Sequence, residues 1–342
     1  MSSPTVLTTV RRLVSGFALV AFLAVAAPAG AQQSEEPILD RVQQLFSSEG
    51  MSLGFLLQAV VDPGIDDDPA RVTVPNARLR LYGQLDNGFG YKLQTNHAGA
   101  ATLLDAQVTW SPGPELSIAA GRFKTPFSRE FLVYGGAIDF VNRSRVVSRL
   151  APNRQMGVQL GGQLNEIVSW TAGGFTGANN ATSDESLIGV VRLEGAGIEV
   201  GEGTLSVAAN FAGGREDAIG ARQLGPAFSG DGILYGADAR FVSGPLMLAG
   251  EYIRGEWEPD FGVTEVESDG LYVTAGYMVQ DDRQLLLRWD RFEAPGQDAD
   301  DVLILGFNAW PTSATEIQVN WQIPLKDSNE LHKLLLNFQV GI

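Results

Sequence analysis

From Met51 onward, the chain consists of segments of about ten residues in which apolar side chains alternate with polar or small ones. In the segment 315–323, positions 317, 319, 321 and 323 carry Ile, Val, Trp and Ile, whereas positions 316, 318, 320 and 322 carry Glu, Gln, Asn and Gln. Because successive side chains of a β-strand point to opposite faces, each segment has one apolar and one polar side. The pattern predicts about sixteen strands, at 51–61, 75–85, 88–96, 101–110, 114–123, 154–163, 166–176, 185–194, 203–212, 232–242, 245–256, 268–279, 283–293, 300–310, 314–323 and 332–342.

The connectors between these strands mostly alternate between short and long. Asp86–Gly88 and Ser111–Pro114 are tight turns, whereas 213–231 and 257–267 are longer connectors. Two connectors depart from the alternation, since 97–100 is short and 195–202 is predicted to be a longish turn. Short turns at one end, longer loops at the other and an even strand number are typical of outer-membrane barrels.

A soluble β-sandwich is the alternative, because alternation alone does not exclude it. However, nearly every predicted strand keeps one polar face, and sixteen such strands need an apolar solvent on their other side. Aromatic residues also fall near strand ends, as interfacial girdles require. We therefore predict an all-β fold, a transmembrane antiparallel β-barrel of about sixteen strands over 51–342.

The N-terminal 50 residues differ in composition from the rest of the chain. Arg11 and Arg12 precede an apolar run that ends near Ala29-Gly30-Ala31, which is typical of a secretory signal peptide at 1–31; a membrane anchor is the alternative. Residues 32–50 have apolar positions at helical spacing and are expected to form a short periplasmic leader helix. The chain has no cysteine, which excludes disulfides, thiolate metal sites and thiol nucleophiles.

The longest connector, at 124–153, is also the most basic part of an acidic chain. The stretch 122–154 holds seven Arg or Lys residues against Glu130 and Asp139, within a chain of formal net charge −16. A connector of this length normally means function or disorder. Its many apolar residues favour an ordered cationic loop folded against something larger. The overall acidity argues against nucleic acid as a partner.

Strand parity assigns further charges to the polar face, which would line the lumen of a barrel. The basic ones are Arg78, Arg80, Lys92, Arg192, Arg240, Arg288 and Lys333, and the acidic ones are Asp105, Asp238, Glu251, Asp290 and Glu316. Arg122 and Arg154 fall on the lipid-facing parity, so we expect them at the rim or after a bulge. With the loop folded inward, the narrow zone becomes cationic, and rings of Arg and Lys are the usual device of anion pores.

Two motifs around the long connector resemble a known family. GRFKTPFSREFL, which enters the connector, and RLAPNRQMGVQLGG, which leaves it, are similar to stretches of the phosphate-selective porin O/P family. The resemblance implies a sixteen-stranded trimeric porin with an inward-folded third loop and basic residues along the pore. The chain departs from the family by ending in Ile342 rather than Phe and by its short length.

We therefore predict an outer-membrane porin for passive diffusion of small anions, with phosphate or related oxyanions preferred. The expected anion-contacting residues are Lys124, Arg129, Arg143, Arg145, Arg149, Arg154, Arg78, Arg80, Lys92 and Arg240. The alternative for Arg143, Arg145 and Arg149 is that they pair with lumen acids and only pin the loop. Small anions, outer-membrane lipid or lipopolysaccharide and two further copies of the chain are the expected partners, and no cofactor or metal is expected.

Other functions compete with this prediction. A general, weakly anion-selective porin is the main alternative, and a structural or adhesive barrel is another, in which the loop would plug the lumen. An enzyme is disfavoured because His97 and His332 are the only histidines and no Gly-x-Ser-x-Gly motif is present. The run Asp66-Asp67-Asp68 would suit a divalent cation, although such runs are more often solvated.

Overall fold

The computed structural model describes residues 50–65, 69–177, 186–217, 229–260, 265–325 and 332–342. All of them belong to one compact unit, residues 46–342. The predicted signal peptide at 1–31 lies outside the described residues, as do the predicted leader at 32–50, apart from its last residue, and Asp66–Asp68.

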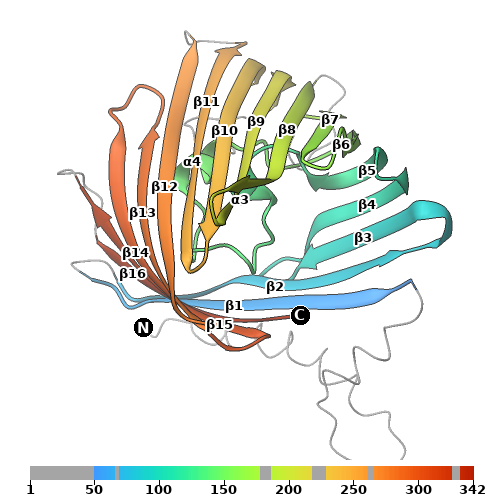
Figure 1. Cartoon of the computed structure of the whole chain (residues 1–342). Coiled ribbons are helices and arrows are strands. Elements are labelled where there is room, and N and C mark those ends of the chain that lie inside the picture. The colour runs from blue at the N-terminus through green and yellow to red at the C-terminus, as the bar shows by residue number, and fades with distance from the viewer. Residues whose placement is uncertain (1–49, 66–68, 178–185, 218–228, 261–264, 326–331) are drawn as a thin grey trace, which may run out of the picture. The chain divides into compact units, whose positions relative to one another are not determined.

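Sixteen antiparallel strands, each paired with its neighbours in sequence, close into a barrel when β1 pairs with β16 (Figure 1). This confirms the predicted fold class and strand number. The strands are β1 (Ser52–Asp62), β2 (Arg71–Gln84), β3 (Phe89–Asn96), β4 (Thr102–Gly113), β5 (Leu116–Lys124), β6 (Arg154–Gln163), β7 (Val168–Phe175), β8 (Leu187–Val200), β9 (Gly203–Glu216), β10 (Gly230–Ser243), β11 (Leu246–Pro259), β12 (Val266–Gln280), β13 (Arg283–Glu293), β14 (Asp300–Thr312), β15 (Thr315–Pro324) and β16 (Lys333–Gly341).

Several predicted connectors are partly strand. The predicted turn at 195–202 is wrong, because β8 continues to Val200 and pairs with Gly203. A register irregularity between Gly195 and Ile198 accommodates Gly197, whose φ is +72°, so the glycines mark a bulge rather than a turn. Likewise, β2 begins at Arg71, inside the connector predicted at 62–74.

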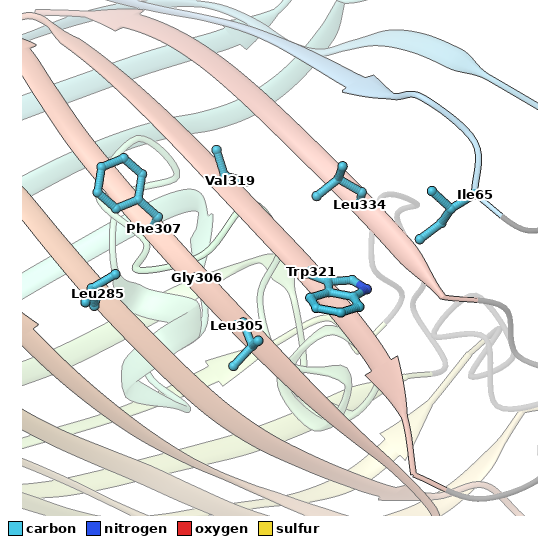
Figure 2. Close-up of a pocket in the computed structure, with 8 residues that line it drawn as sticks. All are labelled: Ile65, Leu285, Leu305, Gly306, Phe307, Val319, Trp321 and Leu334. Carbon is cyan, nitrogen blue, oxygen red and sulfur yellow. The ribbon is translucent and has the colours of Figure 1, made fainter.

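Apolar side chains cover the outer face of the wall, and the inner face carries most of the buried polar ones. Leu285, Leu287 and Trp289 of β13 are exposed, whereas Arg288 and Asp290 are buried. An apolar groove of about 530 Å³ lies on this outer face, and Figure 2 shows its lining along β13–β16. The groove is lined by Ile65, Leu285, Leu305, Gly306, Phe307, Val319, Trp321 and Leu334. The alternation therefore separates an apolar exterior from a polar interior.

The interior also holds an apolar core, which strand parity did not predict. The long connector forms α3 (Arg129–Leu132) and α4 (Arg145–Leu150), which Figure 1 shows within the ring of strands. Phe127, Phe131, Val146, Val147 and Leu150 of the connector are buried. They form one cluster with side chains of the facing wall, namely Phe123, Phe175, Ile188, Val190, Ala212, Leu234, Ile253, Trp257, Tyr272 and Phe292. β8–β11 are therefore apolar on both faces where the loop covers them.

No helix among the described residues is both long and apolar enough to span a membrane.

Candidate functional site

The connector 125–153, called here the inner loop, is ordered by its own capping interactions. Ser128 Oγ accepts a hydrogen bond from Phe131 N (3.1 Å) at the start of α3, and Ser144 Oγ accepts one from Val147 N (3.4 Å) at the start of α4. Serine is a favoured helix N-cap because its hydroxyl satisfies a backbone N–H that has no partner within the helix. The inner loop therefore has a defined local structure.

Between α3 and α4, the inner loop crosses the inner face of β14–β16. Gln318 Nε2 donates to Ile138 O (3.0 Å), Asn308 Nδ2 to Asp139 O (2.8 Å) and Gln339 Nε2 to Gly136 O (2.7 Å). These amides belong to the polar face of their strands, so the alternation that makes the wall amphipathic also provides the loop with partners. The inner loop is thus held inside the barrel by wall residues far away in sequence.

Six of the ten predicted site residues gather on the β2–β6 side of the inner loop, and together they are called here the cationic face: Arg78, Arg80, Lys92, Lys124, Arg143 and Arg154. Lys92 Nζ lies 3.0 Å from Asp105 Oδ2, and Arg154 Nε lies 2.8 Å from Asp105 Oδ1. Within the described part of the chain, Asp105 forms ion pairs with Lys92 and Arg154, two of these six side chains. The cationic face therefore holds more basic than acidic side chains.

Lys124 and Arg143 hold the end of α3. Lys124 Nζ donates to the carbonyls of Phe131 (2.6 Å), Leu132 (3.2 Å) and Val133 (2.7 Å). An ammonium has three donors, so all of its hydrogen bonds go to backbone carbonyls. Arg143 donates from Nε to Glu130 O (2.9 Å) and from Nη2 to Val133 O (2.8 Å). A guanidinium has five N–H groups, so Arg143 keeps further donors.

The environment of Arg143 leaves it charged. Burial lowers the pKa of its guanidinium, the Glu130 carboxylate raises that pKa, and Arg154 lowers it. Because arginine does not lose its proton in proteins, the shift changes the energy of the site but not its charge.

Arg80 and Arg78 flank Tyr134 of the inner loop. The Arg80 guanidinium lies 4.6 Å from the centre of the Tyr82 ring and 4.9 Å from that of Tyr134, so two aromatic rings restrict its orientation. Arg78 Nε donates to Asn76 Oδ1 (2.6 Å). Among the described residues, neither arginine forms a direct ion pair with a carboxylate.

The other four predicted site residues have partners elsewhere. Arg145 lies 3.9 Å from the Asp290 carboxylate and Arg240 lies 3.3 Å from that of Asp139. Arg129 Nη2 donates to Tyr272 Oη (3.5 Å), and the Arg149 guanidinium lies over the Phe292 ring at 5.1 Å. Of these contacts, the one between Arg145 and Asp290 is the kind that the alternative describes, in which a loop arginine pairs with a lumen acid.

Arg154 lies at a strand end, which is one of the places expected from its lipid-facing parity, but its side chain points inward. Its guanidinium bonds to the buried Asp105, on the inner face, rather than pointing to the outside. Arg154 is the first residue of β6 and follows Asn153, whose φ is +58°. A strand end has no preceding pleat to fix its direction, so the side chain can turn inward.

Sequence reasoning missed one feature of the site, the contact between Glu130 and Arg288. Glu130 Oε1 lies 2.6 Å from Arg288 Nη2, and both side chains are buried. Glu130 was visible as one of two acids in a basic loop, and Arg288 by its lumen parity, but no sequence signal joined them. Among the described residues, no group of His, Asp or Glu is arranged to hold a metal ion.

Comparison with known proteins identifies this architecture. The family model described as phosphate-selective porin O and P matches residues 59–288, which is more than half of the chain. The chain belongs to the phosphate-selective porin O and P family. This confirms the resemblance of the loop motifs. A search of curated proteins finds no match for this porin.

Solved structures show the same fold at low sequence identity. This porin matches a loop L8 deletion mutant of OmpT, an outer-membrane protein of Vibrio cholerae, with TM-score 0.64, 12% identity and coverage of 85% of this chain and 99% of that one. It matches the trimer form of in-vitro folded OmpT with TM-score 0.62, 11% identity and coverage of 86% and 100%. It also matches an anion-selective porin from Comamonas acidovorans with TM-score 0.63, 13% identity and coverage of 85% and 98%.

Fold and family together make the protein an outer-membrane porin, so the predicted location is confirmed. They indicate a channel rather than an enzyme.

Proposed function

We propose that this porin passes small anions, with phosphate and related oxyanions preferred, along the cationic face. The observation that supports this most directly is the gathering of six Arg and Lys side chains in the cationic face, where the Asp105 carboxylate pairs with two of them. Rings of Arg and Lys are the usual device for anion and phosphate pores. The family name and the anion-selective porin from Comamonas acidovorans point the same way.

The chemistry of the face suits an oxyanion. A guanidinium offers planar, forked N–H donors that match phosphate oxygens. The cationic face contains three such groups besides that of Arg154, namely those of Arg78, Arg80 and Arg143. Lys124 orders the end of α3 without competing for the anion, because its donors are used by backbone carbonyls. Several weak contacts along the path replace part of the lost hydration and still let the ion leave.

The decisive experiment measures the zero-current potential of the refolded porin in planar bilayers under a salt gradient, followed by phosphate titration into chloride. We expect an anion-selective sign and block of chloride current by phosphate at low concentration. Cation selectivity would overturn the proposal. The control is Arg240→Gln, which removes a positive charge that already pairs with Asp139, so its effect should be smaller than that of Arg80→Gln.

A general, weakly anion-selective porin is the second candidate. It is favoured by the pairing of Arg145 and Arg240 with acids, which lowers the net charge of the pore away from the cationic face. Anion selectivity without phosphate block would support this candidate over the first.

We also propose that three copies assemble in the membrane and that the barrel has no enzymatic activity. The exposed apolar side chains of the outer wall support contact with lipid or with other copies, and OmpT of Vibrio cholerae has a described trimer form. Chemical cross-linking of the protein in native membranes should trap a species of three chains. A single-chain species at all cross-linker concentrations would contradict trimer formation.

A further inference from the structure

We propose that Glu130 is a positioning residue that holds Arg143 in the cationic face, so that this carboxylate makes the pore more anion-selective. The proposal rests on the proposed function in placing the selective path along the cationic face. It assigns to an acidic side chain an effect opposite in sign to that of its charge.

Both carboxylate oxygens of Glu130 are used inside the barrel. Oε1 lies 2.6 Å from Arg288 Nη2. Oε2 accepts from both Ser144 N (2.8 Å) and Ser144 Oγ (2.7 Å). The side-chain exposures are 5% for Glu130 and 1% for Arg288, so water cannot replace these contacts without a cost. One carboxylate therefore joins α3, the N-cap of α4 and the barrel wall.

Arg288 is a rigid anchor for this carboxylate. Its guanidinium lies 4.2 Å from the centre of the Phe140 ring and 4.6 Å from that of Tyr272, and its Nε donates to Thr274 Oγ1 (3.0 Å). Phe140 belongs to the inner loop and Tyr272 to β12, so the loop and the wall both pack on the guanidinium. The position of Glu130 is thus fixed relative to the wall.

The contacts continue from Glu130 to Arg143. Ser144, which both donates to the carboxylate and caps α4, follows Arg143 directly in sequence. The backbone carbonyl of Glu130 accepts from Arg143 Nε (2.9 Å). The backbone of Arg143 and its guanidinium are therefore both tied to Glu130, and from this position Arg143 interacts electrostatically with Arg78 and Lys124.

The sign of the effect separates positioning from plain electrostatics. Neutralising an acid inside a pore makes the potential more positive, which favours anions. If Glu130 positions Arg143, its neutralisation instead releases a cation from the selective path and disfavours anions. Glutamine has the shape of glutamate, but one of its two terminal groups is an NH2, which donates and cannot accept hydrogen bonds. Since Arg288 and Ser144 both donate to the carboxylate, glutamine keeps only one of these two contacts.

The experiment compares zero-current potentials of wild type, Glu130→Gln, Arg143→Gln and the double variant in one salt gradient. Asp139→Asn is the matched control, because it neutralises the other acid of the inner loop, which pairs with the partly exposed Arg240. We expect Glu130→Gln and Arg143→Gln each to lower the anion-to-cation permeability ratio, by roughly twofold from the Coulomb energy of one charge beside a water-filled path. We expect Asp139→Asn to raise it, and the double variant to resemble Arg143→Gln alone.

A rise in anion selectivity for Glu130→Gln, as for Asp139→Asn, would overturn the proposal, and so would simple addition of the two single effects. Each shift is measured against wild type, so the test is valid whichever ion the wild type prefers. A cation-selective wild type would sink the proposed function and leave the role of Glu130 to be decided by the direction of the shift.

Glu130→Gln leaves Arg288 buried without its charged partner, which can prevent folding. Ser144→Ala is the milder variant, since it removes the Oγ contact and the cap while keeping the ion pair. It should lower anion selectivity in the same direction, although no charge has changed, a result that electrostatics alone does not produce. An unchanged potential for Ser144→Ala would contradict the positioning role.

Discussion

Asp105 is the residue on which the charge of the cationic face depends. Its side chain has no exposed surface, and its carboxylate forms ion pairs with both Lys92 and Arg154. Its carboxylate makes the local potential less positive, but it also orders the two cationic side chains. Removing this carboxylate would leave both cations without their ion-pair partner. Asp105 therefore balances the affinity of the face for anions against its order.

We expect Asp105→Asn to raise the anion-to-cation permeability ratio about twofold, because one unit charge at ~8 Å in a water-like medium contributes about 0.5 kcal/mol. The zero-current potential measures this change. The asparagine keeps an acceptor for Arg154, so the barrel should still fold. A fall in the ratio would show that ordering of Lys92 and Arg154 matters more than the charge.

Gly121, near the end of β5, is required by the backbone. Its φ is +126°, and a Cβ there would lie 2.0 Å from the carbonyl oxygen of Ala106 in β4. We expect Gly121→Ala to lower the free energy of unfolding by at least about 1 kcal/mol, since strain and a clash add. Gly99, with φ +136° and no atom within 4 Å of its Cβ position, is the control for strain without a clash. Urea unfolding of Gly121→Ala and Gly99→Ala should separate the cost of the clash from the cost of backbone strain. Equal losses of unfolding free energy in the two variants would contradict a contribution from the clash.

At the scale of elements, the inner loop behaves as a small folded layer inside the barrel. α4 packs on β11–β13 through Val146, Val147 and Leu150, all with almost no exposed surface. The inner loop covers this side of the barrel, and the cationic face lies on the β2–β6 side of the loop. Packing on one side thus determines where ions can pass.

We expect Leu150→Ala to lower the free energy of unfolding by about 2–5 kcal/mol, because it opens a cavity in the buried cluster. It should also increase fluctuations of single-channel current, because the loop is held less firmly. Leu132→Ala is the matched control in the same loop, since Leu132 is 37% exposed and its truncation should change both readouts little. Equal effects of the two variants would contradict the packing of α4 as the anchor.

At the scale of the whole molecule, the closed barrel separates two environments. Outward leucines face the hydrocarbon, and inward polar residues face the lumen or the inner loop. The pairing of β1 with β16 closes the barrel. Next to it, Ile342 N donates to Phe55 O (3.1 Å) and Phe55 N donates to Ile342 O (3.2 Å). The backbone of Ile342 thus extends the ladder between β1 and β16.

We expect Leu287→Arg, on the outer face in the middle of β13, to destabilise the membrane-inserted barrel by about 2–4 kcal/mol. Gln107→Arg, whose register partner is Lys92, adds the same side chain on the inner face and should cost much less while raising anion selectivity. Unfolding from lipid vesicles measures the first effect and the zero-current potential the second. Similar losses of stability would contradict the assignment of the two faces.

The amino-acid sequence by itself determined the strands, their number, the two faces of the wall and the basic loop. These features depend on alternation between neighbours in the chain, which is a local property, and the loop motifs carried the family. The prediction failed at 195–202, where glycines allowed either a turn or a bulge, and parity did not specify the inward direction of the Arg154 side chain, where a strand ends. Both depend on backbone geometry that alternation does not specify.

Only the tertiary structure decided which charges act together. Ten basic residues had equal standing in the sequence, but the path of the loop gathers six of them in the cationic face and gives the other four separate partners. Glu130 and Arg288 are 158 residues apart and meet because β13 and α3 face each other across the barrel interior. Such contacts depend on register, barrel closure and loop packing at once, so no local pattern of side chains contains them.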